Sequence, residues 1–302
     1  MADRATEAGS NGVAPLVHLR LESTPETLTL VRGVLGALSE SLALDPELLD
    51  DLKTAISEAC NNVVVHAYGG EPGPLDVALH LTRGSIVAVV ADEGVGIPDV
   101  AHPDEGVHGV GLPLMKALSD DLEFRQRPDG GTEVRLRFDG RRGGASLFSA
   151  PPEVAEEDGW SWRLTGDAVV SLSPLTFLGP VLGRLARALA ARARFSLDRF
   201  SDVYLVTDAI AAHVTRSAAG PRIGFAIVTD VRRLHISVGP LRAGSGASLQ
   251  AGEEIRQPGS ALLMLSDIVE STAVEDEEML EVVMTDTPGP VPVQPAKPAG
   301  AN

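Results

Sequence analysis

The chain has 302 residues, 44% of them hydrophobic, which suits two globular domains with cores of their own. Its net charge of −17 argues against direct binding to nucleic acid, whose phosphates it would repel. The single cysteine, Cys60, excludes an internal disulfide and a multi-cysteine metal site. Because no apolar run approaches the roughly 20 residues of a membrane span, and MADRATEAGSNG lacks a signal's apolar segment, we expect a cytoplasmic protein with no membrane partner.

The chain up to residue 139 predicts one α+β unit after a disordered leader at residues 1–13. Residues 15–21 alternate like a strand, and two helical patterns follow, each opened by a polar cap residue and an early proline. After GGEPGP come two strands around TRGS, a glycine-rich loop, a short helix and a hairpin turning at PDGG. This order predicts a two-layer sandwich over residues 14–139, with helices on one face of a mixed, mostly antiparallel sheet.

The same order of elements returns in weaker form over residues 158–286. WSWRLTG can match the first strand, SPLTFLGPVLGRLARALAARA the first long helix, and SDVYLVTDAIAAHVTRSA the second. GPRIGFAIVTDVRRLHISVG can match the middle strands, SALLMLSDIVESTAV the short helix and next strand, and EMLEVVMTD the last strand. Six matches in one order predict that the fold is present twice. Residues 140–157 then form a linker, and residues 287–302 a proline-rich, disordered tail.

Glu58 and Asn62 stand four residues apart on the second predicted helix, so they share one of its faces. A carboxylate in such a place can orient a water or take a proton. An amide oxygen can bind a hard cation such as Mg²⁺. Taken alone, the pair is explained more simply as a solvated helix face.

Two glycine-rich stretches follow the predicted strands. Asp92 ends a buried strand in ADEGVGI, where its carboxylate can accept a hydrogen bond from an exocyclic amine, and Gly94 and Gly96 let the backbone approach a flat ring. Gly109 and Gly111 directly precede a helix, whose exposed amides can bind an anion. The pattern is neither a Walker loop nor a dinucleotide fingerprint, and a plain glycine-rich turn explains the first stretch equally well.

Thr132 lies just inside a strand, where its hydroxyl can bond a purine or its water, although an ordinary strand residue explains it equally well. Taken in order, Glu…Asn on a long helix, Asp-x-Gly-x-Gly after a strand, a glycine-rich helix start and Gly-Thr in a strand resemble the GHKL (Bergerat) ATPase superfamily. LKTAISEACNNVVVHAY looks most like the anti-sigma-factor serine/threonine-protein kinases of bacterial partner switching. The resemblance covers about residues 14–139.

The resemblance implies ATP and Mg²⁺ as ligands and gives the residues roles. Glu58 would be the catalytic base or orient a water, Asn62 would ligate Mg²⁺ between the phosphates, and Asp92 would recognise the adenine amine. The remaining positions are Gly94 and Gly96 at the adenine, Gly109 and Gly111 at the phosphates under a lid over about residues 98–110, Thr132 in support of adenine recognition, and His66 with Asn61 at the pocket edge.

Kinases of this type phosphorylate a serine of a STAS-type anti-anti-sigma protein, and in another state they bind a sigma factor. The candidate lid, PDVAHPDEGVHGV, contains neither Lys nor Arg, and only His102 and His108 could carry positive charge there. Because phosphoryl transfer depends on charge neutralisation, two functions stay open: a protein kinase, or a nucleotide-dependent protein-binding switch without phosphotransfer. A detached histidine-kinase catalytic domain is disfavoured, since no dimerisation helix with a phospho-accepting His precedes the fold.

The second copy departs from the pattern at the positions of Asn62, Asp92, Gly109 and Gly111. The matching residues are Ala212 or His213 for Asn62, depending on a one-residue choice of register, VGPLR without a carboxylate around Asp92, and Pro258 and Ser260 around the glycines before the short helix. Residues 158–286 are therefore predicted to keep the fold and to lack the nucleotide site and any metal site. Because kinases of this type act as homodimers, the second copy could replace a partner subunit and form an intrachain pseudo-dimer.

Overall fold

The computed structural model describes residues 14–82, 84–96, 111–128, 130–139, 154, 163–250 and 258–286. In the first half, residues 14–139, the elements are β1 (Val17–Glu22), α1 (Thr27–Leu42), α2 (Pro46–Asn62), a π-helical turn (Val63–Ala67), β2 (Pro74–Thr82), β3 (Ser85–Asp92), α3 (Gly111–Leu118), β4 (Asp121–Gln126) and β5 (Thr132–Asp139).

The second half, residues 163–286, repeats this order with one added helix. Its elements are β6 (Ala168–Leu172), a 3₁₀ turn (Leu175–Phe177), α4 (Leu178–Arg192), α5 (Leu197–Ser217), β7 (Ile223–Asp230), β8 (Arg233–Arg242), α6 (Ser245–Gln250), α7 (Pro258–Leu265), β9 (Ile268–Val274) and β10 (Glu277–Thr285). The added element is α6, which the sequence pattern did not predict.

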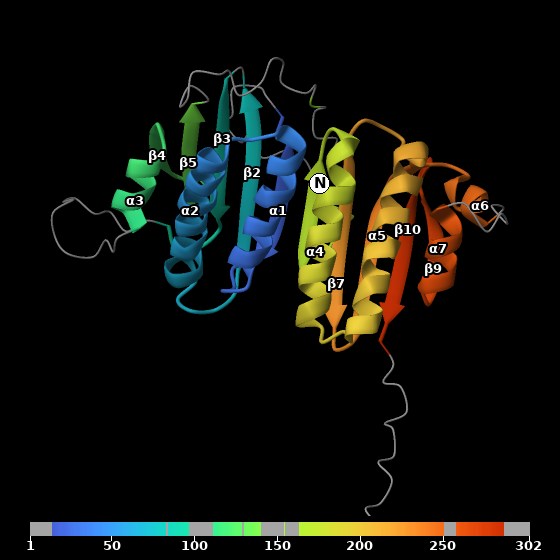
Figure 1. Cartoon of the computed structure of the whole chain (residues 1–302). Helices are drawn as coiled ribbons and strands as arrows, with labels where there is room; N and C mark the ends of the chain where they lie inside the picture. The colour runs from blue at the N-terminus through green and yellow to red at the C-terminus, as the bar shows by residue number, and fades with distance from the viewer. Residues whose placement is uncertain are drawn as a thin grey trace, which may run out of the picture.

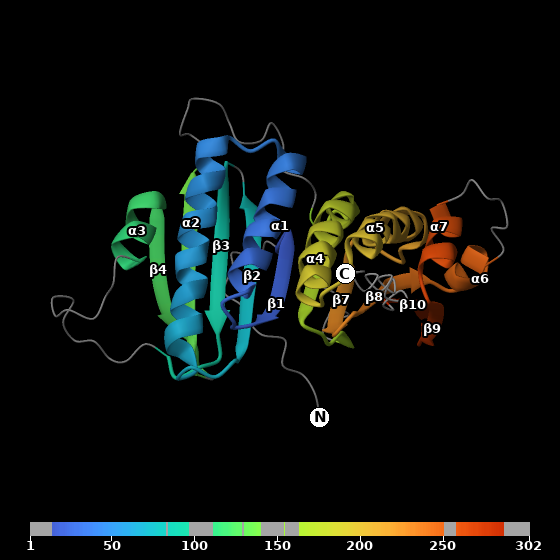
Figure 2. The same ribbon diagram turned by 60° about the horizontal axis from the view of Figure 1, so that its bottom comes forward.

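All ten strands form one sheet in the order β4-β5-β3-β2-β1-β6-β7-β8-β10-β9. Counted outward from its centre, each half follows the same path, β1-β2-β3-β5-β4 and β6-β7-β8-β10-β9. The long helices α1, α2, α4 and α5 lie side by side on one face of the sheet (Figures 1 and 2). The predicted α+β sandwich with helices on one face is confirmed. The sheet was expected to be mixed, whereas every pairing between the described strands is antiparallel.

The two halves meet where β1 pairs with β6 and α1 packs against α4; we call this contact the seam. Leu19 faces Val170 at the middle of the strand pair, and the pairing continues evenly to Val17 with Leu172 and to Leu21 with Ala168. A two-fold axis through the Leu19–Val170 pair would therefore superpose each β1 residue on the β6 residue whose number is higher by 151. This pseudo-two-fold relation makes positions in the two halves directly comparable.

The helices α2 and α5 bury residues at the same spacing. Leu52, Ala55, Ala59 and Val63 on the first half, and Val203, Val206, Ile210 and Val214 on the second, are all at most 4% exposed. Both sets belong to one continuous apolar core between helices and sheet. Apolar residues every three or four positions build such a buried helix face, so the predicted spacing is observed in both halves.

Helix starts decide the register that the sequence left open. Asp45 caps α2, since its Oδ1 accepts from the N–H groups of Glu47 at 2.9 Å and Leu48 at 3.4 Å, as predicted. Ser196 caps α5 through its hydroxyl. With the two caps superposed, Asn62 corresponds to His213 and not to Ala212.

Two local predictions were wrong. The helix α1 begins at Thr27, with no side-chain cap from the Ser/Thr pair before Pro25. The first described strand of the second half is β6, and the described part of WSWRLTG, residues 163–166, precedes it without forming a strand. The physical reason is visible at Leu164, which packs with Val169 and Ala226 in a small separate cluster instead of pairing in the sheet.

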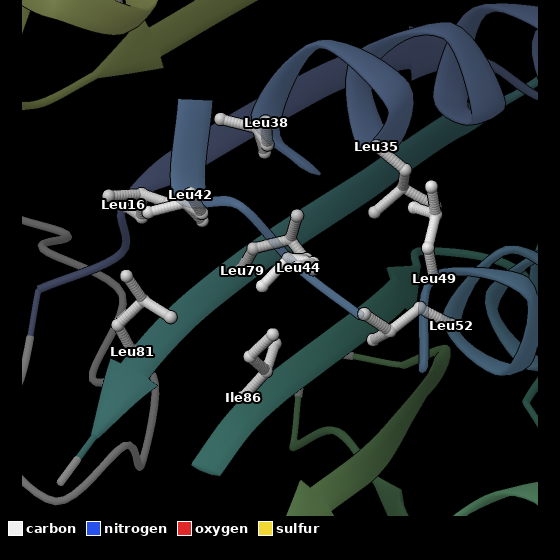
Figure 3. Close-up of a pocket in the computed structure, with 10 residues that line it drawn as sticks. All are labelled: Leu16, Leu35, Leu38, Leu42, Leu44, Leu49, Leu52, Leu79, Leu81 and Ile86. Carbon is white, nitrogen blue, oxygen red and sulfur yellow. The ribbon is translucent and has the colours of Figure 1, made fainter. Parts of the chain in front are cut away.

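A cavity of about 20 Å³ lies in the first half between α1, the start of α2 and the β2–β3 hairpin (Figure 3). Its lining is entirely aliphatic: Leu16, Leu35, Leu38, Leu42, Leu44, Leu49, Leu52, Leu79, Leu81 and Ile86. A void of this size and lining holds no polar ligand and stays dry. It lies at the end of the sandwich opposite to Asn62 and Asp92, which are the last residues of α2 and β3.

Several predictions fall outside the described residues: the leader at 1–13, the linker at 140–157 apart from Val154, the tail at 287–302, and the lid with Gly109. Among the helices of the described ranges, none is long and apolar enough to cross a membrane.

Candidate nucleotide site

The last turn of α2 and the first residue of α3 meet in space. A Cβ added to Gly111 would lie 2.9 Å from Glu58 Oε2 and 3.8 Å from Asn62 Oδ1. Both side chains are partly exposed, as the helix spacing predicted. The structure thus brings a carboxylate oxygen, an amide oxygen and the N-terminal end of a helix to one place. Such a set suits a hard cation together with an anion.

Asp92 ends β3 as a buried carboxylate, 4% exposed. Burial raises the pKa of Asp92, while hydrogen bonds from the N–H groups of Gly94 and Thr132 and the charge of Arg127 act in the opposite direction. The bond from Gly94 N to Asp92 Oδ1 measures 2.9 Å. The second strand of this corner supplies Thr132, itself 8% exposed. A carboxylate held this firmly is pre-oriented to accept a further hydrogen bond.

Glycine is required where the loop after β3 touches the end of α2. A Cβ on Gly94 would lie 2.2 Å from the carbonyl oxygen of Ala67, too close for any side chain. Val95 N donates to the same carbonyl at 3.0 Å. Ala67 closes the π-helical turn that directly follows Asn62, and such turns are frequent at functional sites. Gly96 has a φ of +77°, which favours glycine.

Three residues of this corner escaped the sequence analysis. Tyr68 donates its hydroxyl proton to Pro74 O at 2.5 Å and accepts from Glu93 N at 2.8 Å, so it ties the loop after β3 to β2. Arg127 Nη1 donates to Asp92 O at 3.2 Å from the β4–β5 turn. Gly131, at a φ of +84°, packs against the same carbonyl. The PDGG turn predicts a glycine with a positive φ here, but no sequence pattern predicts the bond from Arg127 to Asp92 O.

Other predicted positions take no part in these contacts. His66 is exposed on the π-helical turn, and Asn61 is partly exposed. Cys60 is fully buried, and burial raises the pKa of its thiol to about 12, so it is an apolar core residue and not a nucleophile. Within the described residues no group of three or more His, Cys, Asp or Glu side chains could hold a metal ion.

The second half differs at each position just described. With the caps superposed, Ala209 and His213 stand where α2 has its acid and its amide. Pro258 begins α7, where α3 has a glycine. The Nε2 of His213 is buried and makes no hydrogen bond among the described residues, and burial lowers the pKa of its ring. On α5, neither Ala209 nor His213 carries a side-chain oxygen.

At the strand position of Thr132, the second half carries Glu278, since Leu280 pairs with Val238 as Val134 pairs with Val90. Its carboxylate accepts hydrogen bonds from Gly244 N, Gly246 N, Ser245 Oγ and Ser271 Oγ, at 2.5 to 2.8 Å. These bonds lower the pKa of Glu278 to about 2. The Glu278 carboxylate therefore holds the loop after β8 by hydrogen bonds.

The fold is that of a GHKL ATPase. Residues 21–138 match the sequence profile of the histidine kinase-like ATPase domain, and the chain belongs to this family. It is of the anti-sigma-factor serine kinase type. Similar proteins include an anti-sigma F factor of Caldanaerobacter subterraneus subsp. tengcongensis, 31% identical over 130 residues, which are 40% of this chain and 91% of that protein.

A serine-protein kinase RsbW of Bacillus pumilus is 30% identical over 144 residues, 42% of this chain and 88% of that protein. Among solved structures, the RsbU and RsbW domains of a Mycobacterium tuberculosis protein share 26% identity, with a TM-score of 0.33 over 40% of this chain and 31% of that one. The two matches therefore span nearly the whole length of each relative but less than half of this chain.

Proposed function

We propose that this chain is an Mg-ATP-binding regulator of partner switching. It would phosphorylate a STAS-type antagonist protein, sequester a sigma factor, or do both, and act in the cytoplasm. The observation that carries the proposal is the convergence of Glu58, Asn62 and Gly111 at the start of α3. The names of the similar proteins, anti-sigma F factor and serine-protein kinase RsbW, support the same class of partner.

The residues present fit Mg²⁺ and a polyphosphate. Asn62 Oδ1 would hold the cation, since hard cations prefer oxygen ligands. Bound Mg²⁺ neutralises phosphate charge during phosphoryl transfer. Glu58 would hold the proton of the attacking hydroxyl or orient it, and the N–H groups at the start of α3 would face the phosphates.

Asp92 would recognise the base, because its buried carboxylate can accept from an exocyclic amine. Gly94, Gly96 and Thr132 would line the pocket around it, and His66 its edge. Of the predicted phosphate-binding glycines, Gly111 has the supporting contact with Glu58. The role of Gly109 remains part of the proposal on the sequence alone.

Calorimetric titration of Mg-ATP tests the site. Wild-type protein should bind, and Asp92→Asn and Asn62→Ala should each lose roughly tenfold or more in affinity, since a hydrogen bond to a charged partner contributes about 1.5–3 kcal/mol. His213→Ala, at the matching position of the second half, is the control and should bind like wild type. No binding by wild type would remove the central claim, and unchanged binding by both site variants would remove the residue assignments.

A second function, a nucleotide-dependent switch that holds partners without phosphotransfer, is favoured by one observation. The predicted lid carries no Lys or Arg, and Arg127, which lies near Asp92, donates to the backbone carbonyl of that residue. Incubation with γ-labelled ATP and a STAS protein separates the two functions. Label on the STAS protein that disappears in Glu58→Gln supports the kinase, whereas ATP binding without label supports the switch.

The division of the chain belongs to the proposal as well. We propose that residues 14–139 are the ATP-binding domain and residues 158–286 a degenerate copy without a nucleotide site. The equal strand paths of the two halves support this duplication. The second copy would take the place of a partner subunit, giving an intrachain pseudo-dimer. Sedimentation that finds an obligate homodimer through the first half would contradict it.

A further inference from the structure

The seam between the halves is not symmetric in its side chains, although its backbone is close to two-fold. On the helix side, Arg184 of α4 reaches α1, where its Nη1 would lie 3.3 Å from a Cβ added to Gly36. The same guanidinium donates to the carboxylate of Glu40 on α1. Gly36 and Glu40 of α1 thus accommodate the guanidinium of Arg184 from α4.

Exchanging the halves removes this fit. By the constant difference of 151 residues, the counterpart of Arg184 in the first half is Gly33, so two first halves paired at this edge would leave Glu40 without a cation. The counterparts of Gly36 and Glu40 in the second half are Arg187 and Ala191. Two second halves would therefore place guanidinium groups against each other with no carboxylate between them, which is repulsive.

The strand side of the seam is asymmetric too. Arg222, 3% exposed, donates from Nη1 to Ser171 Oγ at 3.1 Å and from Nη2 to Pro15 O at 2.5 Å. The second of these bonds crosses from the second half to the first. Phe225 on β7 pairs with Val170, and Val77 on β2 pairs with Leu19, so Phe225 and Val77 are counterparts. The first-half counterpart of Arg222, three residues earlier, is therefore a proline.

Pro74 is that counterpart, and it has neither a side-chain donor nor a backbone N–H. Two first halves could not reproduce the buried bond to Pro15 O. A carbonyl that loses its partner on burial costs free energy. Both sides of the seam therefore favour the mixed pair.

We propose that the edge formed by α1 and β1 is a heterotypic docking surface, shaped for the second half of this chain in preference to another copy of the first half. An exposed ion pair adds little stability, so the value of Arg184 lies in discrimination between partners. The chain then carries one ATP site per closed pair of halves. This inference rests on the seam and the pseudo-dimer proposal, and it holds whether or not the first half binds ATP.

Cysteine crosslinking of the full-length chain, in a Cys60→Ala background, tests the docking surface. Arg20→Cys with Val169→Cys joins residues that face each other across the seam, and oxidation should give an intrachain disulfide at monomer mass. His18→Cys with Arg20→Cys probes the other arrangement, since these residues would face each other only between two first halves. It should give little covalent dimer.

The decisive variant combines Arg184→Glu with Arg222→Leu. In the His18→Cys/Arg20→Cys background it should raise the yield of covalent dimer by about fivefold or more, because both discriminating contacts are gone. Adding Glu40→Arg should reverse part of the rise, which also shows that the variant is folded. The matched control, Arg187→Glu, should change nothing.

Two results would overturn the inference. One is abundant covalent dimer in the unaltered seam. The other is a dimer yield for Arg184→Glu/Arg222→Leu that equals the yield of Arg187→Glu. Titration of ATP with the same preparations keeps a failure of this inference separate from a failure of the ATP site.

Discussion

The two halves of the molecule agree best at the corner that follows their short helices. In the first half, Asp120 N donates to Arg137 O at 2.8 Å, and Asp120 Oδ2 accepts from Asp139 N at 2.7 Å. In the second half, Asp267 N donates to Val283 O at 2.8 Å, and its Oδ2 accepts from Thr285 N at 2.5 Å. The same two hydrogen bonds therefore occur at this corner in both halves, far from the candidate site residues.

The halves differ most at the opposite corner of α2 and α5. The first half has the carboxylate of Glu58 and the amide of Asn62 there, and the second half has Ala209, His213 and the carboxylate of Glu278, which binds its own loop. The comparison teaches that the apolar spacing builds the sandwich, while the acid and amide on α2 contribute to something other than folding.

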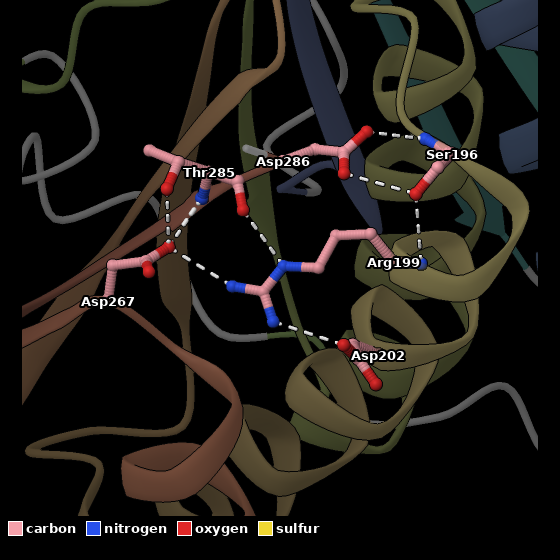
Figure 4. Close-up of polar contacts among 6 residues, drawn as sticks. All are labelled: Ser196, Arg199, Asp202, Asp267, Thr285 and Asp286. Carbon is pink, nitrogen blue, oxygen red and sulfur yellow. Dashed lines mark hydrogen bonds and ion pairs between the residues drawn. The ribbon is translucent and has the colours of Figure 1, made fainter. Parts of the chain in front are cut away.

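The second half adds polar bonds at the start of α5 (Figure 4). Arg199 donates to Asp202, Asp267 and Thr285 O at 2.9 to 3.0 Å. Asp286 accepts from the N–H and hydroxyl of Ser196 at 2.6 and 3.0 Å. The position of Arg199 in the first half is Leu48, an apolar core residue. The half without the proposed site therefore has the more extensively bonded helix start.

Truncation of the core is the largest expected perturbation. Leu52→Ala should cost about 3–5 kcal/mol, since Leu52 is 1% exposed and already borders the cavity, and Val203→Ala about 2 kcal/mol. Because the apolar core is continuous, both variants should shift one urea unfolding transition followed by circular dichroism. Two separate transitions would show that the halves unfold independently.

Gly94→Ala should cost about 2–4 kcal/mol and weaken ATP binding, because the new Cβ would meet the carbonyl of Ala67 and the loop must shift. Thermal unfolding and ATP titration measure the two effects. Gly33→Ala is the matched control, as no atom lies within 4 Å of the added Cβ. There we expect a gain of about 0.5–1 kcal/mol from helix propensity. Equal effects of the two changes would refute the close approach at Gly94.

Glu278→Gln should destabilise the second half by about 1–2 kcal/mol, a value reduced for solvent screening at a partly exposed carboxylate. The folded pKa of Glu278, about 2, lies below its ordinary value of 4.5. Its stabilisation is therefore full above pH 5 and is lost as the pH falls towards 2. Urea unfolding between pH 3 and 7 should show a weaker acid dependence in the variant. ATP binding by the first half should not change, and a parallel loss of binding would contradict the separation of the two corners.

Arg127→Ala is the smallest expected effect, a three- to tenfold loss of ATP affinity at pH 7. The charge of Arg127 opposes the raised pKa of Asp92, so its removal raises that pKa further. As the pH falls, Asp92 should therefore become protonated, and ATP affinity should be lost, at a higher pH in the variant than in wild type. Titration from pH 5 to 8 measures the shift. Arg125→Ala, on the exposed face of the same hairpin beside Glu123, is the control, and a profile equal to that of Arg127→Ala would refute the role.

Much of the fold was predictable from sequence because its signals are local. The spacing of Leu52, Ala55 and Ala59 and the cap at Asp45 specify α2 without reference to the rest of the chain. The first strand of the second half was misplaced because alternation in WSWRLTG imitates a strand. Whether Leu164 pairs in a sheet or packs on one depends on its tertiary neighbours.

The candidate site was predictable in its residue types and less so in its geometry. Motif order brought Glu58, Asn62 and Asp92 to attention, but the contact of Gly111 with Glu58 joins segments far apart in the chain. The bond from Arg127 to Asp92 O depends on how a hairpin turn lies over a neighbouring loop. No periodicity encodes such contacts, since they arise only once the sheet has formed.

The pairing of β1 with β6 has a consequence for synthesis on the ribosome. The other strand beside β1 is β2, and β2 to β5 all precede β6 in the chain. The first sandwich can therefore form while β6 is still untranslated. At roughly 5–20 residues per second, β1 then presents an unpaired edge for seconds, and unpaired edges recruit foreign strands. The interval between β5 and β6 sets how long each nascent chain is exposed to that hazard, so slow codons in this stretch would lower the yield of correctly closed protein.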